Sequence, residues 1–518
     1  MRLALASGVV CGSTALTKRA DVQCYLGIPF AASPVGELRF RAPRPVAPWA
    51  GELEAKRFGP AAPQNPDPFM TANDYFQPVN SEADCLNLNV WTPRADAQAR
   101  PVMVWIHGGG YIGGSNSSGL NNGAELAATF DVVVVSINYR LGALGYLQLG
   151  HLLGEEFADA GNLGVLDQIA ALEWVRDNIA VFGGDPTCVT IFGESAGGAA
   201  VATLLGTPRA EGLFHRAIVQ SGTAERARSL PESEAVTAAF LEAAGLTELT
   251  ASRLLDMSLD GLLAAQGRFA DEFAQGVVGL ALPFQPTIDG RVLSELPLDA
   301  VRRGVNSGVP LLVGTNRNEA SFFTEPMSGD GDSVEATEAK ISSVFAEEFP
   351  SDADAQAAVY KAVLADELGH EPRPRQVLEA LLTDRLYRQP TNRLLDARAA
   401  GPAKTYSYLF TWQTPLFDGR MGACHVLDVP FIFRQLDRIE AVSLVGEHPP
   451  HQLSDWMSAT WVRFADTGVP LSAALPEWAP YEPDSRSTME LNTRPTLLMD
   501  PLAGLREYWL QAVAVSAS

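Results

Sequence analysis

A short stretch around Ser195 carries the residue pattern of an activated nucleophile. An apolar, β-branched run over residues 188–192 leads into Gly193-Glu194-Ser195-Ala196-Gly197, and small residues follow. A G-x-S-x-G pentapeptide between a strand and a helix predicts a nucleophile elbow, a sharp turn that exposes the serine hydroxyl. The N-terminus of the following helix offers free N–H groups and a positive dipole end to a developing oxyanion. The pentapeptide alone is a weak pattern, but the strand before it and the helix after it argue against a plain glycine-rich turn.

A glycine run follows another expected strand, over residues 102–106, in the sequence His107-Gly108-Gly109-Gly110. Glycines allow backbone N–H groups to turn toward one point without interference from Cβ atoms, as an oxyanion hole requires. The alternative is a phosphate-binding loop, but no Lys-Ser or Lys-Thr follows and the run does not match a dinucleotide fingerprint. Together with the elbow, this run indicates esterase or lipase chemistry.

An elbow serine needs an acid and a histidine further along the chain, in that order. The chain has seven histidines, and those after Ser195 are His215, His370, His425, His448 and His451. His425 is the best placed on local context, because it lies in a loop of small residues after an expected strand. An exposed loop histidine remains the alternative for any of them. Among 61 acidic residues, Glu319 follows a buried strand that ends in a turn, which suits a triad acid.

The apolar runs predict the elements that must position these residues. Strands are expected at 86–91, 102–106, 132–137, 188–192, 214–220, 311–313 and 405–412, with a helix at 162–182 between them. Runs that do not alternate polar and apolar residues are typical of buried parallel strands. The fold class is therefore α/β, with a large, mainly parallel sheet and helices on both faces.

We expect one catalytic domain over residues 1–518, with helical insertions at about 225–275 and 334–400 that could cap the sheet. At the N-terminus, residues 3–12 are expected to form a hairpin with residues 22–28. This interpretation is preferred over a lipoprotein signal, because the apolar run before Cys11 is short and the bulky Val10 precedes the cysteine.

Composition excludes several classes of function. The chain has 518 residues, 47% of them hydrophobic and 19% charged, with a net charge of −23. Such an acidic surface repels nucleic acid and anionic membranes, and no apolar run approaches the roughly 20 residues of a transmembrane helix. The five cysteines are scattered, so neither a disulfide framework nor a metal site is expected. We expect no cofactor, a cytoplasmic location, and a monomer or small homo-oligomer.

The chain resembles the type B carboxylesterases, the family that includes cholinesterases and bacterial para-nitrobenzyl esterases. The matching motifs extend over nearly the whole chain and include those at 25–31, 34–40, 84–91, 136–145, 161–168, 192–198, 220–222, 314–319 and 422–425. The resemblance implies an α/β-hydrolase fold and a serine esterase that needs no cofactor.

By this resemblance, the catalytic triad is Ser195, Glu319 and His425. The oxyanion donors are the N–H groups of Gly109, Gly110 and Ala196, and Ser221 and Asp428 match positions that support the histidine. Leu280 and Leu282 match positions that narrow the acyl pocket in cholinesterases when they are aromatic; packing in the core is the alternative for both leucines.

The sequence also departs from the family pattern. No cysteine lies between Cys24 and Cys85, so the loop disulfide found in many relatives is absent. The choline-binding tryptophan of cholinesterases has no counterpart, and Tyr75 and Phe76 are the nearest aromatic residues, so a choline ester is not the expected substrate.

The predicted function is hydrolysis of small to medium apolar carboxylic esters, which are small-molecule substrates, through an acyl-enzyme. Two alternatives remain open at this point. The same triad could hydrolyse amides or carbamates, since the catalytic groups would be identical. The chain could also be a non-catalytic binding module of this fold, although such relatives typically lose the serine, and Ser195 is present.

Overall fold

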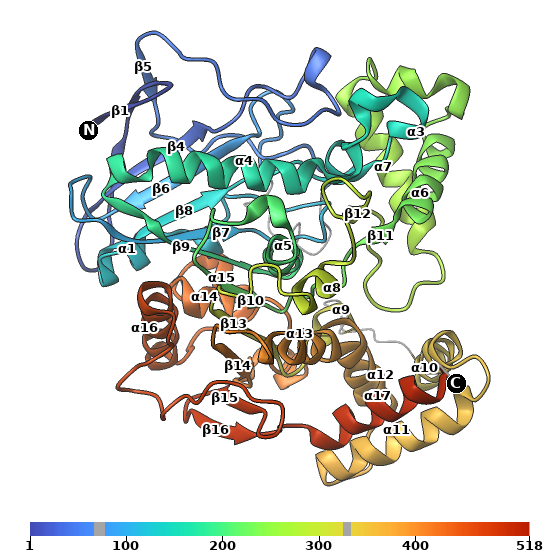
Figure 1. Cartoon of the computed structure of the whole chain (residues 1–518). Helices are drawn as coiled ribbons and strands as arrows, with labels where there is room; N and C mark the ends of the chain where they lie inside the picture. Colours follow the sequence, from blue (N-terminus) through green and yellow to red (C-terminus); the bar gives the residue numbers. More distant parts are fainter. Residues whose placement is uncertain (67–77, 325–332, 517–518) are drawn as a thin grey trace.

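The computed structural model describes residues 1–66, 78–324 and 333–516, and a twisted sheet runs through its centre (Figure 1). In the described part this sheet has 11 strands in the order β16-β15-β14-β13-β10-β9-β7-β8-β6-β4-β3. In chain order they are β3 (Ser13–Ala15), β4 (Val22–Pro29), β6 (Asn87–Thr92), β7 (Arg100–Ile106), β8 (Val133–Ile137), β9 (Gly184–Glu194), β10 (Arg216–Gln220), β13 (Leu311–Asn316), β14 (Thr405–Phe410), β15 (Ser487–Leu491) and β16 (Thr496–Met499).

The middle of the sheet is parallel, as predicted. Strands β8, β7, β9, β10, β13, β14 and β15 pair in parallel with their neighbours, and antiparallel pairs occur only toward the two edges. Every residue of β8, β13 and β14 is buried. Burial on both faces explains why these segments do not alternate polar and apolar residues.

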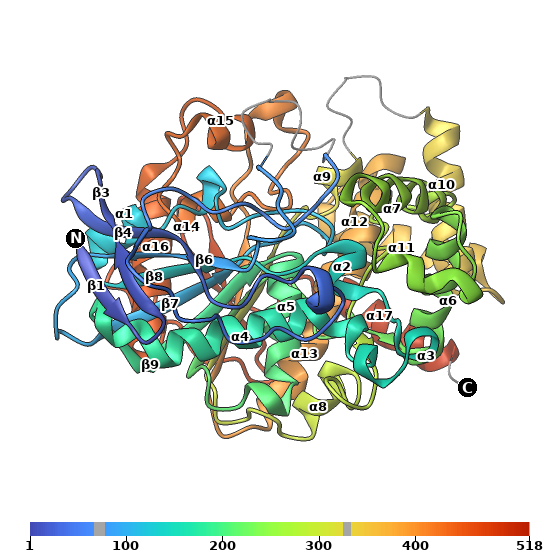
Figure 2. The same cartoon turned by 90° about the horizontal axis from the view of Figure 1, so that it is seen from above.

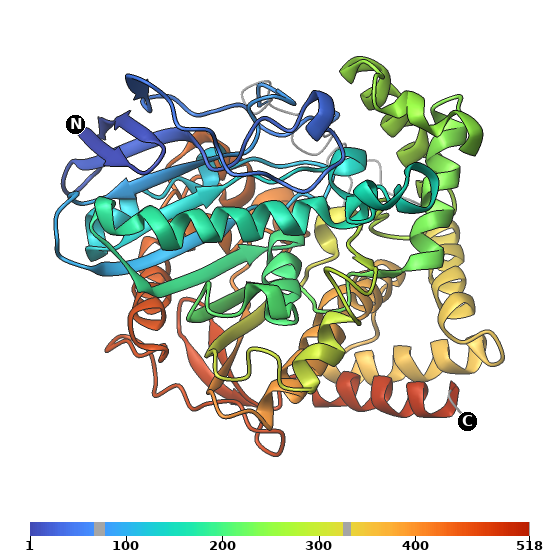
Figure 3. The same cartoon turned by 45° about the horizontal axis from the view of Figure 1, so that its top comes forward.

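Helices cover both faces of the sheet, and β7 shows how one strand serves two cores. Val102, Val104 and Ile106 pack into one hydrophobic cluster, while Met103 and Trp105 pack into the other. The first cluster includes side chains of α4 (Leu163–Asn178) and α5 (Ala196–Leu205), and the second includes those of α16 (His451–Thr467). Because successive side chains of a strand point to opposite faces, this division shows that the sheet is sandwiched between two helical layers (Figure 3).

Several shorter α-helices are spread along the described part of the chain. They are α1 (Ala124–Phe130), α2 (Gly142–Tyr146), α3 (Gly150–Leu153), α8 (Pro297–Arg302), α9 (Ser321–Thr324), α14 (Val429–Ile432) and α15 (Ile439–Val445).

Both segments expected to be helical insertions contain helices. The first holds α6 (Leu230–Ala243) and α7 (Leu259–Ala274); the second holds α10 (Val334–Glu348), α11 (Ala353–Leu368), α12 (Pro374–Thr383), the π-helix η9 (Asp384–Arg388) and α13 (Gln389–Ala399). Helices α10 to α12 form a third hydrophobic cluster with the C-terminal helix α17 (Ala503–Ser516), whereas α13 contacts β13 and β14. In Figure 2 these helices occupy the half of the molecule opposite the N-terminal strands. The division into one domain with two insertions stays a prediction.

The predicted N-terminal hairpin was wrong in its pairing. Strand β1 (Arg2–Leu5) pairs with β2 (Gly8–Cys11), and β2 also pairs with β5 (Glu52–Glu54) in a separate three-stranded sheet. The segment 22–28 instead pairs, within β4, with β3. A two-residue turn at Ala6 and Ser7, followed by Gly8, closes the first hairpin locally.

No helix in the described ranges is both long enough and apolar enough to cross a membrane.

Candidate active site

Ser195 lies at the sharp turn between β9 and α5. Its backbone has φ 57° and ψ −124°, a left-handed conformation that is strained for a residue with a side chain. The Ser195 N–H donates to the carbonyl of Gln220 at 3.0 Å, which ties the turn to the end of the neighbouring strand β10. A Cβ atom on Gly197 would lie 2.0 Å from the carbonyl oxygen of Ile106, so only glycine permits this close approach. These contacts build the nucleophile elbow that the pentapeptide predicts.

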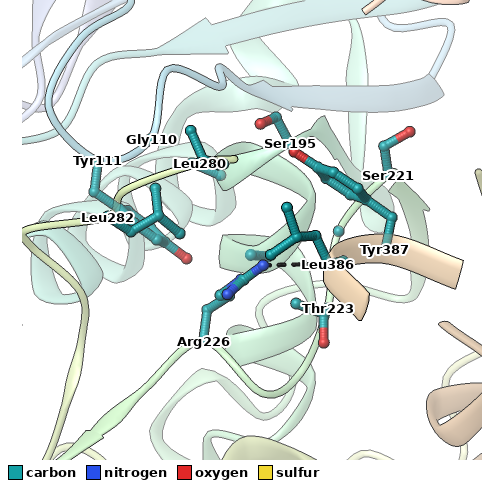
Figure 4. Close-up of a pocket in the computed structure, with 13 residues that line it drawn as sticks. Gly110, Tyr111, Ser195, Ser221, Thr223, Arg226, Leu280, Leu282, Leu386 and Tyr387 are labelled. Atoms are coloured by element: carbon teal, nitrogen blue, oxygen red, sulfur yellow. Dashed lines mark hydrogen bonds between the residues drawn. The ribbon is translucent and has the colours of Figure 1, made fainter. Parts of the chain in front are cut away.

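The glycine run leaves the end of β7 beside this turn. Gly109 and Gly110 have φ values of 108° and 61°, and a Cβ atom on Gly109 would lie 2.3 Å from the carbonyl oxygen of Gly113. Within the described residues, the N–H groups of Gly109, Gly110 and Ala196 donate no hydrogen bond to another protein group. Gly110 and Ala196 line the same pocket as Ser195 (Figure 4). Free donors beside a serine hydroxyl are what a tetrahedral oxyanion requires.

Glu319 and His425 form a fully buried pair. Glu319 Oε2 lies 2.7 Å from His425 Nδ1, and the two side chains are 0% and 3% exposed. The other carboxylate oxygen, Oε1, accepts hydrogen bonds from Ser221 Oγ at 2.6 Å and from the N–H of Asn316 at 2.7 Å. With its carboxylate held on both oxygens, Glu319 fixes the orientation of the imidazole and favours a proton on Nδ1.

Ser221 and Asp428 both lie near the histidine, but neither hydrogen-bonds it. Ser221 acts on Glu319, whereas Asp428 accepts hydrogen bonds from Gln220 Nε2 at 2.9 Å and from Tyr408 Oη at 3.2 Å. Burial, reinforced by the nearby Glu319, raises the pKa of Asp428 to about 6. Because Gln220 also accepts the hydrogen bond of the Ser195 N–H, Asp428 links the histidine loop to the elbow.

Sequence reasoning missed a second carboxylate on the imidazole, that of Glu194, the residue before Ser195. Its buried carboxylate oxygen Oε1 lies 3.1 Å from His425 Nε2, so the ring sits between two carboxylates. Burial raises the pKa of Glu194 to about 8. In this conformation no hydrogen bond joins Ser195 Oγ to His425 Nε2 within the described residues. Apo structures often show loose catalytic geometry that tightens with substrate.

The two carboxylates also determine the charge of the histidine. Burial alone would lower the pKa of His425, but the attraction of Glu194 and Glu319 outweighs burial and raises the pKa to about 9. The available sequence signal for Glu194 was an acidic residue inside the G-x-S-x-G pentapeptide, at the buried end of strand β9.

Aromatic rings shield this cluster from water. The ring centroids of Tyr387, Phe323 and Phe322 lie 4.8, 5.4 and 6.2 Å from that of His425. Tyr387, on the π-helix η9, also lines the pocket at Ser195. Tyr75 and Phe76 lie outside the described residues.

The predicted acyl-pocket leucines reach the serine. Leu280 and Leu282 both line the pocket with Ser195, as does Arg226, which sequence reasoning did not single out (Figure 4). Within the described residues, none of the groups around Ser195 is placed to hold a metal ion. In the described part, the potential ligands that cluster are Cys11, Glu52 and Glu54, on the separate N-terminal sheet, and both glutamates pair with basic residues there. All five cysteines are free.

A serine elbow on a mainly parallel sheet, with a buried carboxylate–histidine pair behind it, defines a serine hydrolase of the α/β-hydrolase fold. The sequence model of the Carboxylesterase family matches residues 2–506, and the chain belongs to this family. The family resemblance and the fold class expected from the sequence are therefore confirmed.

Characterised relatives agree. The chain is 36% identical to the para-nitrobenzyl esterase of Bacillus subtilis (strain 168), over 95% of both chains. It is 33% identical to the phenmedipham hydrolase of Pseudarthrobacter oxydans, over 90% of both chains. Among solved structures, the carboxylesterase EST55 of Geobacillus stearothermophilus superposes with a TM-score of 0.84 at 35% identity, covering 98% of this chain and 99% of that one. The chain is thus a carboxylic-ester hydrolase, and the alternative of a non-catalytic binding module is set aside.

The two carboxylates around His425 predict an unusual pH dependence. Replacing Glu194 by Gln removes one of the charges that favour the imidazolium, so the pKa of His425 should fall. Because the neutral ring is the base, the acid limb of kcat/KM should move to lower pH, by about one unit or more. Initial rates on a neutral ester, measured across the pH range in which the protein stays folded, provide the measurement.

Glu173→Gln is the matched control, because it removes the same charge from the exposed side of α4. An acid limb that stays at the same pH in Glu194→Gln would show that this carboxylate does not act on His425.

Proposed function

We propose that Ser195, His425 and Glu319 are the catalytic triad and hydrolyse carboxylic esters through an acyl-enzyme. The observation that carries this proposal is the buried 2.7 Å contact between Glu319 and His425, one residue of which follows β13 and the other β14. Glu319 and His425 are more than a hundred residues apart in the sequence. The Glu319 carboxylate binds Nδ1 of the imidazole, and Nε2 faces the elbow. That is the arrangement a general base needs.

The reaction follows from this geometry. Ser195 Oγ attacks the ester carbonyl while His425 Nε2 accepts its proton, and Glu319 stabilises the imidazolium that forms. The carbonyl oxygen becomes an oxyanion and takes hydrogen bonds from the N–H groups of Gly109, Gly110 and Ala196. His425 then gives its proton to the leaving alcohol. Water attacks the acyl-enzyme by the same steps, which releases the acid and frees Ser195.

Burial raises the pKa of Glu194 to about 8, but in its ionised form this residue adds a second negative charge beside the imidazolium. This charge favours the protonated ring during attack, but it also makes the resting ring harder to deprotonate. Ser221 and Asp428 are positioning residues in this proposal: Ser221 holds Glu319, and Asp428 holds the chain between the histidine and the elbow.

The pocket beside Ser195 is proposed to bind the acyl group. The leaving alcohol must lie near His425, which protonates it, yet the pocket is lined by Ser195, Gly110 and Ala196 and not by His425. Leu280 and Leu282 give it an apolar wall. The Arg228 guanidinium holds that wall in place by donating hydrogen bonds to the carbonyl oxygens of Leu282 and Pro283. Small to medium apolar acyl groups fit such a lining.

For the alcohol part of the ester, the names of the relatives are the guide to candidate substrates. Para-nitrobenzyl esters and phenmedipham belong in the first substrate panel, because the relatives carry those names. Amides and carbamates share the catalytic requirement and stay an alternative substrate class. The cytoplasmic location, the oligomeric state and the absence of a cofactor stay predictions.

Ser195→Ala tests the nucleophile. The variant should fold normally, because the alanine removes only a hydroxyl at a turn held by backbone bonds, and it should lose nearly all ester hydrolysis. Rates on para-nitrophenyl butyrate, compared with thermal unfolding and circular dichroism, give both readouts. A folded Ser195→Ala protein that keeps most of its turnover would exclude the acyl-enzyme mechanism.

Leu282→Phe tests the acyl pocket. The wild type should prefer butyrate and hexanoate esters over acetate, since each buried methylene is worth up to about 0.8 kcal/mol. The larger ring should crowd Gly110, because Leu282 Cδ2 already lies 3.3 Å from where a Cβ on that glycine would be. The preference should then return toward acetate, and Leu282→Ala should shift it toward longer chains. If the ratios of kcat/KM along the series are the same in all three proteins, Leu282 does not line the acyl pocket.

A further inference from the structure

Arg226 brings a positive charge into the otherwise apolar pocket at Ser195. It lies in the segment between β10 and α6, is partly buried, and lines the same pocket as Leu280 and Leu282. In Figure 4 its guanidinium points in among Leu282, Leu386 and Thr223, away from the ribbon that carries it. Neutral apolar esters give no reason for a cation at this position.

The charge of Arg226 has no carboxylate partner among the described residues. Within those residues it donates one hydrogen bond, from Nη2 to the carbonyl oxygen of Leu386 on η9, at 3.2 Å. The adjacent Glu225 is bound instead by Arg393, through two bonds of 2.6 and 2.7 Å. Burial lowers the pKa of Arg226. The phenols of Tyr387 and Tyr111 raise it and so partly oppose the effect of burial.

Several arginines of the described residues that are more deeply buried than Arg226 make more bonds. Arg140 makes a two-pronged ion pair with Asp167, and Arg39 pairs with Glu82. Arg398 pairs with no acidic residue in the described ranges, but it donates to three carbonyl oxygens, those of Asn306, Ser307 and Val309. Arg226 stands apart, with one carbonyl bond and several donors left over at the pocket wall. These donors are free to bind an anionic group that enters the pocket.

We propose that Arg226 binds an acidic group at the far end of the acyl chain, so that the enzyme favours half-esters of short dicarboxylic acids. This inference rests on the proposed function, because it assigns the acyl side of the pocket by reference to Ser195 and His425. A guanidinium presents donors in a planar fork that matches a carboxylate. The leucine wall accommodates the methylenes between the reacting carbonyl and the distal carboxylate.

The chemistry needs no further reactant. Ser195 displaces the alcohol from the half-ester and forms an ester with one carboxyl carbon, while the distal carboxylate stays on Arg226. Water then cleaves that ester, which yields the free dicarboxylate, one proton and the regenerated serine.

Kinetics on charged and neutral partners tests the proposal. The substrates are the monoethyl esters of succinate, glutarate and adipate, each compared with its neutral diethyl ester, with acid release followed at neutral pH. The wild type should show a higher kcat/KM for at least one half-ester than for its diester. In Arg226→Gln that half-ester should lose about 10- to 100-fold in kcat/KM, since hydrogen bonds between charged groups are the strong ones. The diesters should change by only a few fold, and Arg226→Lys should recover part of the loss.

Arg385→Gln is the matched control. It removes a positive charge one residue from Leu386, but Arg385 pairs with Glu347 and Glu348 and does not line the pocket. This variant should leave the ratio of half-ester to diester unchanged.

The outcomes separate the two proposals. If the diesters are hydrolysed through Ser195 but no half-ester is favoured, or if Arg226→Gln lowers both substrates equally, Arg226 only braces η9 and the anion-binding inference is overturned. If neither substrate class depends on Ser195, the proposed function itself fails. Should Arg226→Gln fold poorly, the half-ester preference of the wild type and the charge-retaining Arg226→Lys still decide the question.

Discussion

The structure depends on one buried interaction, the contact between Glu319 and His425. The parallel sheet creates it, because the loops after β13 and β14 leave the same edge at which β9 delivers Ser195 and β7 delivers the glycine run. Each functional group comes from a different strand, so none of these strands could be shifted by one residue without separating the groups. The two hydrophobic cores, one on each face of the sheet, hold the strands in that register.

Burial strengthens the interactions between charges in this cluster and limits how many of its groups can be charged at once. Glu194, Glu319 and Asp428 all lie out of water with one histidine among them, so they cannot all be charged without large cost. Protons must be shared: burial raises the pKa of both Glu194 and Asp428, and the carboxylates raise that of His425. In the proposed mechanism, the same low polarity that penalises these charges strengthens the attraction between Glu319 and the imidazolium.

Local patterns were enough to predict part of this arrangement. The elbow at Ser195 and the glycine run at Gly109 and Gly110 could be inferred from the sequence because their function is a backbone conformation, and backbone conformation leaves a local signature of glycines. The parallel sheet was predictable for a similar reason, since burial on both faces removes alternation. His425 and Glu319 were only candidates on context and needed the family resemblance.

Other features could not be predicted because they arise from contacts between distant segments. Nothing near Glu194 in the sequence shows that it faces His425, and nothing near Arg226 shows that its neighbour Glu225 is taken by Arg393. The N-terminal pairing failed for the opposite reason: a local two-residue turn competes with a longer-range hairpin, and the hydrophobic pattern cannot decide between them.

The acylation rate of Glu319→Gln tests the central claim most directly. The glutamine keeps the shape of the side chain but removes the charge that fixes the tautomer and stabilises the imidazolium. Rapid-mixing measurements of the first turnover on a para-nitrophenyl ester should show acylation slowed by about 10³- to 10⁴-fold, as for triads whose acid is neutralised in place. The thermal midpoint of unfolding identifies any loss that comes from misfolding. A folded Glu319→Gln protein that acylates within a few fold of the wild-type rate would contradict the account.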